Sequence, residues 1–307
     1  MNKVECFKIR LLSFENEADI FNINKGKPIY EIGCLRPWLS FNPKQIEADP
    51  FLFVKNDTLF LFYEHKAFLD KGVLRMVCSK DLKTWTNPVT VLEEPFHLSF
   101  PWVFERDGQV YMIPESEEKR RIGLYKATND QLTQFEFTKT VLEDSDDSFI
   151  SFCDTTIIEK EGTFYLFTTR QIVDHINTLE LYCSQSIMGP FVPHPLSPIA
   201  KNSKLGRNAG SILEVNGKLI RFAQDCTHHY GDNVHLCEVE CLTPTEYRET
   251  LLKENIIPES IPYYKNGGHQ YNIVKFRNKW IVATDAKEYH SMKANKLVRK
   301  LLYLFRK

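Results

Sequence analysis

Residues 47–64 read EADPFLFVKNDTLFLFYE. An acid, Asp49, precedes an apolar run, a tight turn at 56–57 and an alternating aromatic run that ends at Glu64. Two strand-like runs joined by a two-residue turn of this kind predict a β-hairpin. The pattern recurs with turns at 107–108, 161–162, 216–217 and 277–278, so that consecutive turns are 51 to 61 residues apart.

A repeat of this length is typical of a propeller blade with four strands. A third strand-like run follows the hairpin in the first four repeats, and helical periodicity is scarce. The sequence therefore predicts an all-β fold, a five-bladed β-propeller of four-stranded antiparallel blades with a short C-terminal amphipathic helix. A β-sandwich with coincidental spacing is the alternative. We expect residues 1–44 to close or cap the propeller, 45–289 to form it, and 290–307 to form the helix.

Composition narrows the class of protein. The 307 residues are 43% hydrophobic and 13% aromatic, which suffices for a sizeable core. A net charge of −1 gives no general attraction to nucleic acid, so we expect no nucleic-acid partner. The eight cysteines are scattered through strand-like runs, and the first residues do not resemble a signal peptide. These features favour reduced cysteines and a cytoplasmic protein, and they suggest neither a metal nor a cofactor.

The last 18 residues, 290–307, carry lysine and arginine on one side of the predicted helix and apolar side chains on the other. A basic amphipathic helix can lie in the surface of an anionic membrane, which would make the protein peripheral to the inner membrane. The alternative is a helix that packs on the flank of the propeller.

Polar residues at the starts and ends of the repeated strands predict one shared site. The residues that precede the five apolar runs should converge on the propeller axis, and an antiparallel second strand returns to the same face. The candidate catalytic residues are Asp49, Asp154 and Asp225, and the candidate substrate-binding residues are Glu64, Trp102, Glu115, Arg207, Gln224, His228, Tyr230 and His269. For Glu64 and Glu115, hydrogen bonding between blades is an equally good interpretation.

The five repeats, with Ala48-Asp49-Pro50 opening the first, resemble the propellers of the family-43 glycoside hydrolases and their arabinanase, levansucrase and invertase relatives. In those enzymes an equivalent Asp-Pro supplies the general base or nucleophile, so the resemblance implies that role for Asp49. Their second blade typically begins with Trp-Ala-Pro-Asp, whereas this chain has SFPW at 99–102. The acid of the second blade is absent, and we expect Trp102 at the position in the second blade that is equivalent to Asp49.

A second resemblance covers most of the chain. The sequence motifs that carry this resemblance are ADPF at 48–51, FPWVFE at 100–105, RNAGS at 207–211 and RFAQDC at 221–226. They are similar to the N-terminal propeller domain of plant glucosamine inositolphosphorylceramide transferases and to bacterial proteins of surface-polysaccharide synthesis. The resemblance implies a sugar or glycan ligand, and we also expect a sugar-nucleotide donor and an anionic membrane surface as partners.

These observations favour glycosyl transfer in surface-glycan or glycolipid synthesis. Such chemistry generally uses two carboxyl groups, about 5 to 9.5 Å apart in glycosidases. We expect Asp49 to act as base or nucleophile, Asp154 or Asp225 as the second carboxylate, and Arg207 to bind a donor phosphate or a sugar hydroxyl. Two alternatives stay open: a non-catalytic carbohydrate-binding propeller that assists a partner transferase, and an intracellular glycosidase.

Overall fold

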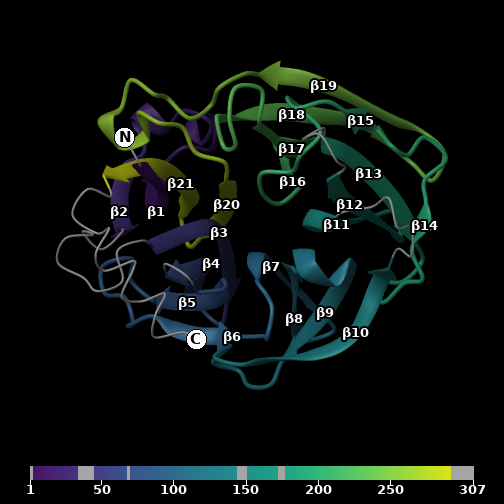
Figure 1. The fold of residues 1–307 in the computed structure, drawn as a ribbon, viewed down its shortest axis with the longest axis horizontal. Helices are drawn as coiled ribbons and strands as arrows, with labels where there is room; N and C mark the ends of the chain where they lie inside the picture. The colour runs from purple at the N-terminus through teal and green to yellow at the C-terminus, as the bar shows by residue number, and fades with distance from the viewer. Residues whose placement is uncertain (1–2, 34–44, 68–69, 144–150, 172–176, 292–307) are drawn as a thin grey trace.

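The computed structural model of the protein describes residues 3–33, 45–67, 70–143, 151–171 and 177–291 (Figure 1). The described part of the chain is all-β, as the sequence predicts. It consists of strands and of four 3-10 helices of three residues each: Glu17–Asp19, Ile23–Lys25, Glu117–Lys119 and Pro262–Tyr264.

The described strands form four sheets, and the largest divides at a single parallel pair between β1 and β3 into two antiparallel sets, so we describe five sets. Set one contains β3 (Gln45–Lys55), β4 (Thr58–Ala67), β5 (Val73–Ser79) and β6 (Val89–Leu92). Set two contains β7 (Ser99–Arg106), β8 (Gln109–Glu115), β9 (Arg121–Ala127) and β10 (Phe135–Glu143). Set three contains β11 (Ser151–Lys160), β12 (Thr163–Gln171), β13 (Asn177–Ser184), β14 (Val192–Pro193) and β15 (Ala200–Lys201). Set four contains β16 (Leu213–Val215), β17 (Lys218–Asp225), β18 (Asn233–Leu242) and β19 (Tyr247–Lys253). Set five contains β20 (Tyr271–Phe276), β21 (Lys279–Ser291), β1 (Lys3–Phe14) and β2 (Lys27–Ile32).

Each set begins with a hairpin whose two-residue turn lies where the sequence predicts it. In set one, Asn56 and Asp57 have φ angles of 47° and 54°. Positive φ at both central positions matches the right-handed twist of the flanking strands, and Asn and Asp tolerate it better than most residues. Lys55 and Thr58 accordingly pair across the turn. The predicted hairpins are therefore confirmed, because local turn chemistry specifies them.

Set five combines strands from the two ends of the chain. β1 pairs with β21 along its whole length, from Lys3 opposite Ser291 to Phe14 opposite Trp280. The other edge of β1 pairs with β2, and a single parallel pair joins it to β3 of set one. The segment before residue 45 thus supplies two strands to this sheet.

The five sets lie side by side around a central axis, with β3, β7, β11, β16 and β20 innermost (Figure 1). One buried apolar cluster lies between each pair of neighbouring sets, including sets five and one. Phe62 and Met112, for example, belong to the cluster between sets one and two. Both faces of these strands are therefore buried near the core, which explains why residues 59–63 of β4 are apolar at every position.

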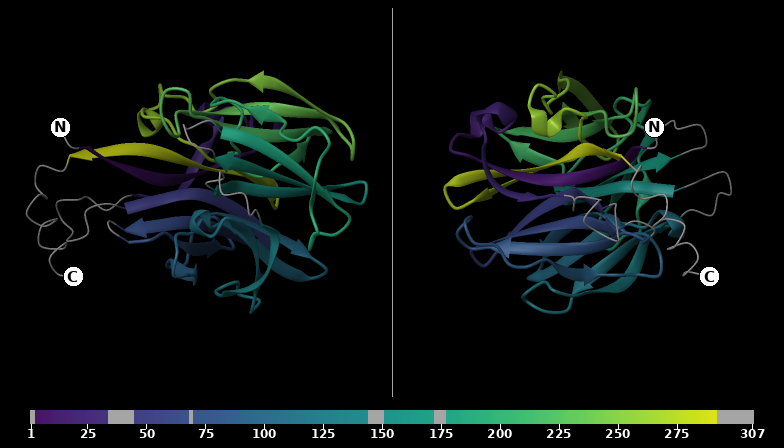
Figure 2. Two further views of the ribbon diagram at one scale, coloured as in Figure 1. Left: turned by 45° about the vertical axis from the view of Figure 1, so that its right-hand side comes forward. Right: turned by 60° about the vertical axis from the view of Figure 1, so that its left-hand side comes forward.

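Two hairpins extend past the other strands on one side of the molecule. These are β1 with β21, and β3 with β4, which pair out to Gln45 opposite Ala67 (Figure 2). β21 continues to Ser291, two residues into the range predicted to be helical. The rest of that range, 292–307, lies outside the described residues.

Candidate functional site

Three of the innermost strands carry the same irregularity. In β3, β7 and β11 the pairing with the second strand shifts by a β-bulge, and a residue within each bulge has a positive φ: Asp49 (52°), Phe100 (45°) and Asp154 (51°). A bulge re-aims the side chain, and a non-glycine residue at positive φ is uncommon. The counterpart of Asp49 in set two is therefore Phe100. The predicted equivalence with Trp102 is wrong, because Trp102 lies beyond the bulge and stacks on Phe104 in the core.

Side chains from all five sets enclose a cavity of about 270 Å³ at this end of the axis. The cavity brings together seven of the residues singled out from the sequence: Asp49, Glu64, Glu115, Asp154, Arg207, Tyr230 and His269. The other lining residues are Phe7, Ile46, Lys66, His97, Ser99 and Cys153.

Four predicted site residues do not line this cavity. Asp225 lies 3.0 Å from Nε2 of the buried His235, a partner across the neighbouring strand. Gln224 is buried in the same strand, and Trp102 belongs to the core. The side chain of His228 is 78% exposed outside the cavity. The structure thus leaves Asp49 and Asp154 as the candidate catalytic carboxylates that share the cavity.

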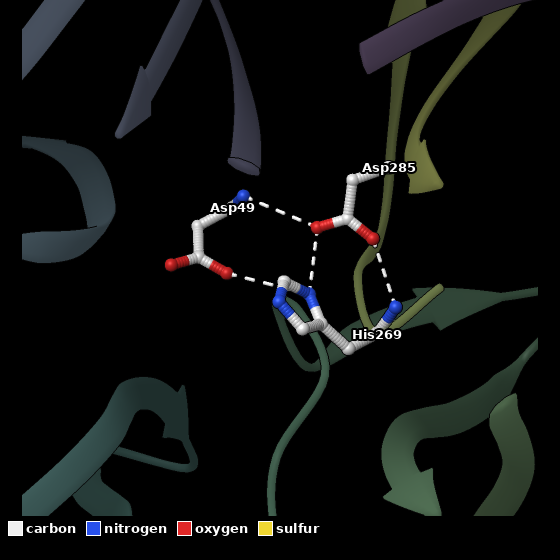
Figure 3. A group of neighbouring side chains, drawn as sticks. All are labelled: Asp49, His269 and Asp285. Carbon is white, nitrogen blue, oxygen red and sulfur yellow. Dashed lines mark hydrogen bonds and ion pairs between the residues drawn. The ribbon is translucent and has the colours of Figure 1, made fainter. Parts of the chain in front are cut away.

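Two residues of the cavity wall, Asp49 and His269, form a group of charged side chains with Asp285, which lies behind them (Figure 3). His269 Nδ1 lies 2.6 Å from Asp285 Oδ2 and 3.6 Å from Asp49 Oδ1. The backbone N–H groups of Asp49, His269 and Gln270 also donate to the Asp285 carboxylate. Asp285 is fully buried and therefore fixes the first strand of set one against the start of set five.

The charges in this group are coupled. Burial lowers the pKa of His269, but the Asp285 and Asp49 carboxylates outweigh it and raise the pKa to about 9, so the imidazole is positive at neutral pH. Burial raises the pKa of Asp49 to about 6; the positive His269 opposes this shift, and Asp285 and Asp154 add to it. Asp49 therefore exchanges its proton close to neutral pH, as a general base does.

The same three residues each offer a ligand atom, all within 4.8 Å of one another, which is a spacing that a cation could use. Their contacts argue for another interpretation. The two oxygens of Asp285 already accept three backbone N–H groups and the ring of His269. We therefore interpret Asp49, His269 and Asp285 as three side chains that pair with one another through ionic contacts.

The opposite wall contains Asp154, Arg207 and Glu115. Arg207 Nε donates to Asp154 Oδ2, and a terminal nitrogen of the same guanidinium lies 3.9 Å from Glu115 Oε2. The Asp154 backbone N–H donates to Glu115 Oε2 at 3.0 Å, so Glu115 of set two caps the bulge of set three. Burial and the nearby Asp154 carboxylate raise the pKa of Glu115 well above its usual range, which favours the neutral acid. The geometry is compatible with both roles predicted for Glu115, because its carboxyl group hydrogen-bonds to the neighbouring set and also lines the cavity.

Glu64 meets a neutral histidine. His97 Nδ1 accepts the backbone N–H of Gly72 at 2.9 Å, so the proton is on Nε2, which lies 3.4 Å from Glu64 Oε1. Burial and then the positive charge of Lys66 lower the pKa of His97 to about 4, which keeps the ring neutral. The His97 ring that faces Glu64 is therefore neutral.

Aromatic rings flank the cavity beside His269. Phe7 stacks on the imidazole with centroids 4.4 Å apart, and Tyr230 meets it edge-on at 5.1 Å. Tyr230 is 43% exposed, and its ring lies 5.1 Å from the Arg207 guanidinium. The buried Lys287 donates to the Tyr230 carbonyl and pairs with Glu5, which holds this loop in place.

Sequence reasoning missed two cavity residues that bear on chemistry, Lys66 and His97. Lys66 is two positions after Glu64, so it shares a strand face with it, and this alternation is the signal that could have found it. His97 has no such signal, because it enters the cavity from the loop between β6 and β7.

The fold is that of carbohydrate-active propeller enzymes. The solved structure of a Cellvibrio cellulosa α-L-arabinanase with arabinohexaose matches 71% of this chain and 82% of its own, with a TM-score of 0.54 and 18% identity. A family-117 glycoside hydrolase from Zobellia galactanivorans matches 78% and 84%, with a TM-score of 0.55 and 11% identity. At these identities the likeness shows the fold alone.

Sequence comparison gives the family. The model of the N-terminal region of glucosamine inositolphosphorylceramide transferase 1 matches residues 26–296, and the chain belongs to this family. Glucosamine inositolphosphorylceramide transferase 1 of Arabidopsis thaliana is 34% identical over 244 residues, and that of Oryza sativa subsp. japonica is 35% identical over 225. These matches span 76% and 70% of this chain but only 30% and 29% of the plant proteins.

Proposed function

We propose that this protein is a five-bladed β-propeller whose axial cavity binds a sugar and takes part in glycosyl transfer for glycolipid or surface-glycan synthesis. Each antiparallel set would be one blade, and the apolar cluster between sets five and one supports a closed ring. The observation that carries the functional proposal is the gathering of four carboxyl groups, Asp49, Glu64, Glu115 and Asp154, in one cavity. Such groups can hydrogen-bond sugar hydroxyls and exchange protons with them.

In this proposal Asp49 is the base that accepts a proton from the attacking hydroxyl. Its pKa of about 6 suits that role at neutral pH. Glu115, favoured in its neutral form, donates a hydrogen bond or a proton to the leaving oxygen. Asp154 is the second carboxylate, and its ion pair with Arg207 holds it in place. Arg207 acts mainly on Asp154, since that pair already occupies its Nε.

The test is an Asp49→Asn variant assayed for release of nucleotide diphosphate from a panel of sugar nucleotides with glycolipid acceptors. We expect turnover to fall at least a hundredfold while sugar binding, measured by calorimetry, changes little, because the amide keeps the shape but accepts no proton. Asp225→Asn is the matched control, since Asp225 does not line the cavity. Undiminished turnover in Asp49→Asn would exclude Asp49 as the base.

A non-catalytic carbohydrate-binding propeller is the second candidate. The plant relatives named as transferases match this chain over about 30% of their length, so their named activity belongs to much longer proteins. Phe100, at the position in set two that corresponds to Asp49, supplies no carboxyl group. This candidate expects glycan binding by the wild type without turnover of any donor, which the same assay detects.

We also propose a cytoplasmic location at an anionic membrane surface. The described residues include no helix long and apolar enough to span a membrane. Lys287 of β21 is opposite Phe7, which lines the cavity. β21 ends at Ser291, and the basic segment 292–307 comes next in the sequence. As an amphipathic helix, that segment would bring the cavity close to lipid-linked glycans. Co-sedimentation with phosphatidylserine vesicles, with and without residues 292–307, tests this.

A further inference from the structure

The cations of the cavity are not equally available to a ligand. Arg207 is engaged by Asp154, and His269 lies between Asp285 and Asp49. His97 is neutral, since its Nδ1 accepts a backbone N–H group. Lys66 also lines the cavity, and it pairs with no carboxylate among the residues that the structure describes. Among the described residues that line the cavity, Lys66 is thus the cation that forms no ion pair with a carboxylate.

Lys66 also differs from the carboxyl groups in depth. It lies on the extended part of the β3–β4 hairpin, where it is opposite Ile46, whereas Glu64 is opposite Ala48 and next to Asp49. Two residues along a strand correspond to about 7 Å, so Lys66 is farther out than Glu64 by roughly that distance. Glu64 is 6% exposed and Lys66 is only partly buried. Along this wall the negative side chains, Glu64 and Asp49, therefore lie deeper in the cavity, and the positive Lys66 lies nearer its mouth.

We infer that Lys66 binds the phosphate of a phosphorylated sugar or polyol whose ring lies among the carboxyl groups deeper in the cavity. A ring with hydroxyl groups matches the inner acceptors, and an ammonium group at the mouth binds phosphate as a point charge. The phosphate can belong to a sugar nucleotide or to the headgroup of a phosphoinositol lipid. This inference rests on the proposed sugar-binding function and assigns to Lys66 the anion-binding role that the sequence had suggested for Arg207.

The experiment compares phosphorylated and neutral ligands by titration calorimetry at low salt. The pairs are UDP-N-acetylglucosamine with N-acetylglucosamine, and myo-inositol 1-phosphate with myo-inositol. We expect wild type to bind one phosphorylated ligand about 10- to 100-fold more tightly than its neutral partner, the size of a charge-assisted hydrogen bond. Lys66→Gln should remove that preference and leave affinity for the neutral ligand unchanged. Lys66→Arg should keep much of it.

Lys126→Gln is the matched control, because Lys126 is an exposed lysine of β9 outside the cavity. The pair that shows the Lys66-dependent preference identifies the source of the phosphate. Equal affinity of wild type for phosphorylated and neutral ligands, or an undiminished preference in Lys66→Gln, overturns the inference and leaves sugar binding intact. If wild type binds neither kind of ligand, the proposed function fails together with the inference.

Discussion

The fully buried carboxylate of Asp285 is the most direct place to test the electrostatics of the cavity. Asp285→Asn keeps the shape of the side chain and removes its charge. The variant loses the largest contribution that raises the pKa of His269, and burial alone lowers that pKa. We therefore expect a neutral His269 in the variant at pH 7 and above.

The magnitude follows from the pKa of His269, which rises from 6.5 to about 9 on folding. A shift of about 2.5 units corresponds to roughly 3 kcal/mol, at about 1.4 kcal/mol per unit. Because the folded-state pKa is the higher one, this stabilisation is complete below pH 6.5 and is lost as the pH rises through 9. Between pH 6.5 and 9.5 the free energy of unfolding should fall by roughly 3 kcal/mol more in wild type than in Asp285→Asn.

Urea unfolding followed by the fluorescence of the four tryptophans measures this difference at several pH values. Asp57→Asn is the control. Asp57 also pairs with a cation, Arg277, but this ion pair is exposed and lies at the hairpin turns, away from His269. The control should keep the pH dependence of wild type. If the unfolding free energies of wild type and Asp285→Asn decrease in parallel, His269 does not draw its charge from Asp285, and the reasoning is refuted.

Two further substitutions test the packing around the site. Arg207→Gln leaves the buried Asp154 without its cation and should lower the free energy of unfolding by about 3 to 5 kcal/mol. Adding Asp154→Asn to this variant should restore part of the lost stability. If the effects of the two substitutions are purely additive, the ion pair is contradicted. Gly210→Ala should lower the melting temperature strongly or prevent folding, because a Cβ there would lie 2.0 Å from the Tyr271 carbonyl oxygen at a φ of 146°. Gly33→Ala is its control, since a Cβ there meets nothing within 4 Å in the described part of the chain, and equal melting temperatures for the two variants would rule out the close approach.

The strands and hairpin turns were predictable because they depend on neighbouring residues. Asn56 and Asp57 adopt the backbone that their turn requires, and the runs on either side alternate as strands do. Asp49 and Asp154 were found for a related reason: both occupy the same position in a repeated unit. Repetition allows a long-range arrangement to be inferred from local similarity.

The rest of the site depends on features that a sequence pattern does not display. A bulge changes which residue faces the cavity, so aligning the apolar runs put Trp102 in the place of Phe100. Lys66 was missed because β4 continues three residues past Glu64, its apparent end, through pairing with the start of β3. Asp225 was assigned to the site because its partner, His235, belongs to the next strand and is not evident from spacing alone.

The joining of the two chain ends in set five has a consequence for synthesis of the protein. β1 ends at Phe14, but its antiparallel neighbour β21 begins only at Lys279 and is translated much later. Until then the apolar side chains of Ile9 and Leu11, which are fully buried in the finished protein, have no β21 to cover them. Each of sets one to four is contiguous in sequence, whereas set five cannot form until β20 and β21 have been translated. We expect the nascent chain to depend on chaperones during that interval, because contacts of such long sequence separation form slowly.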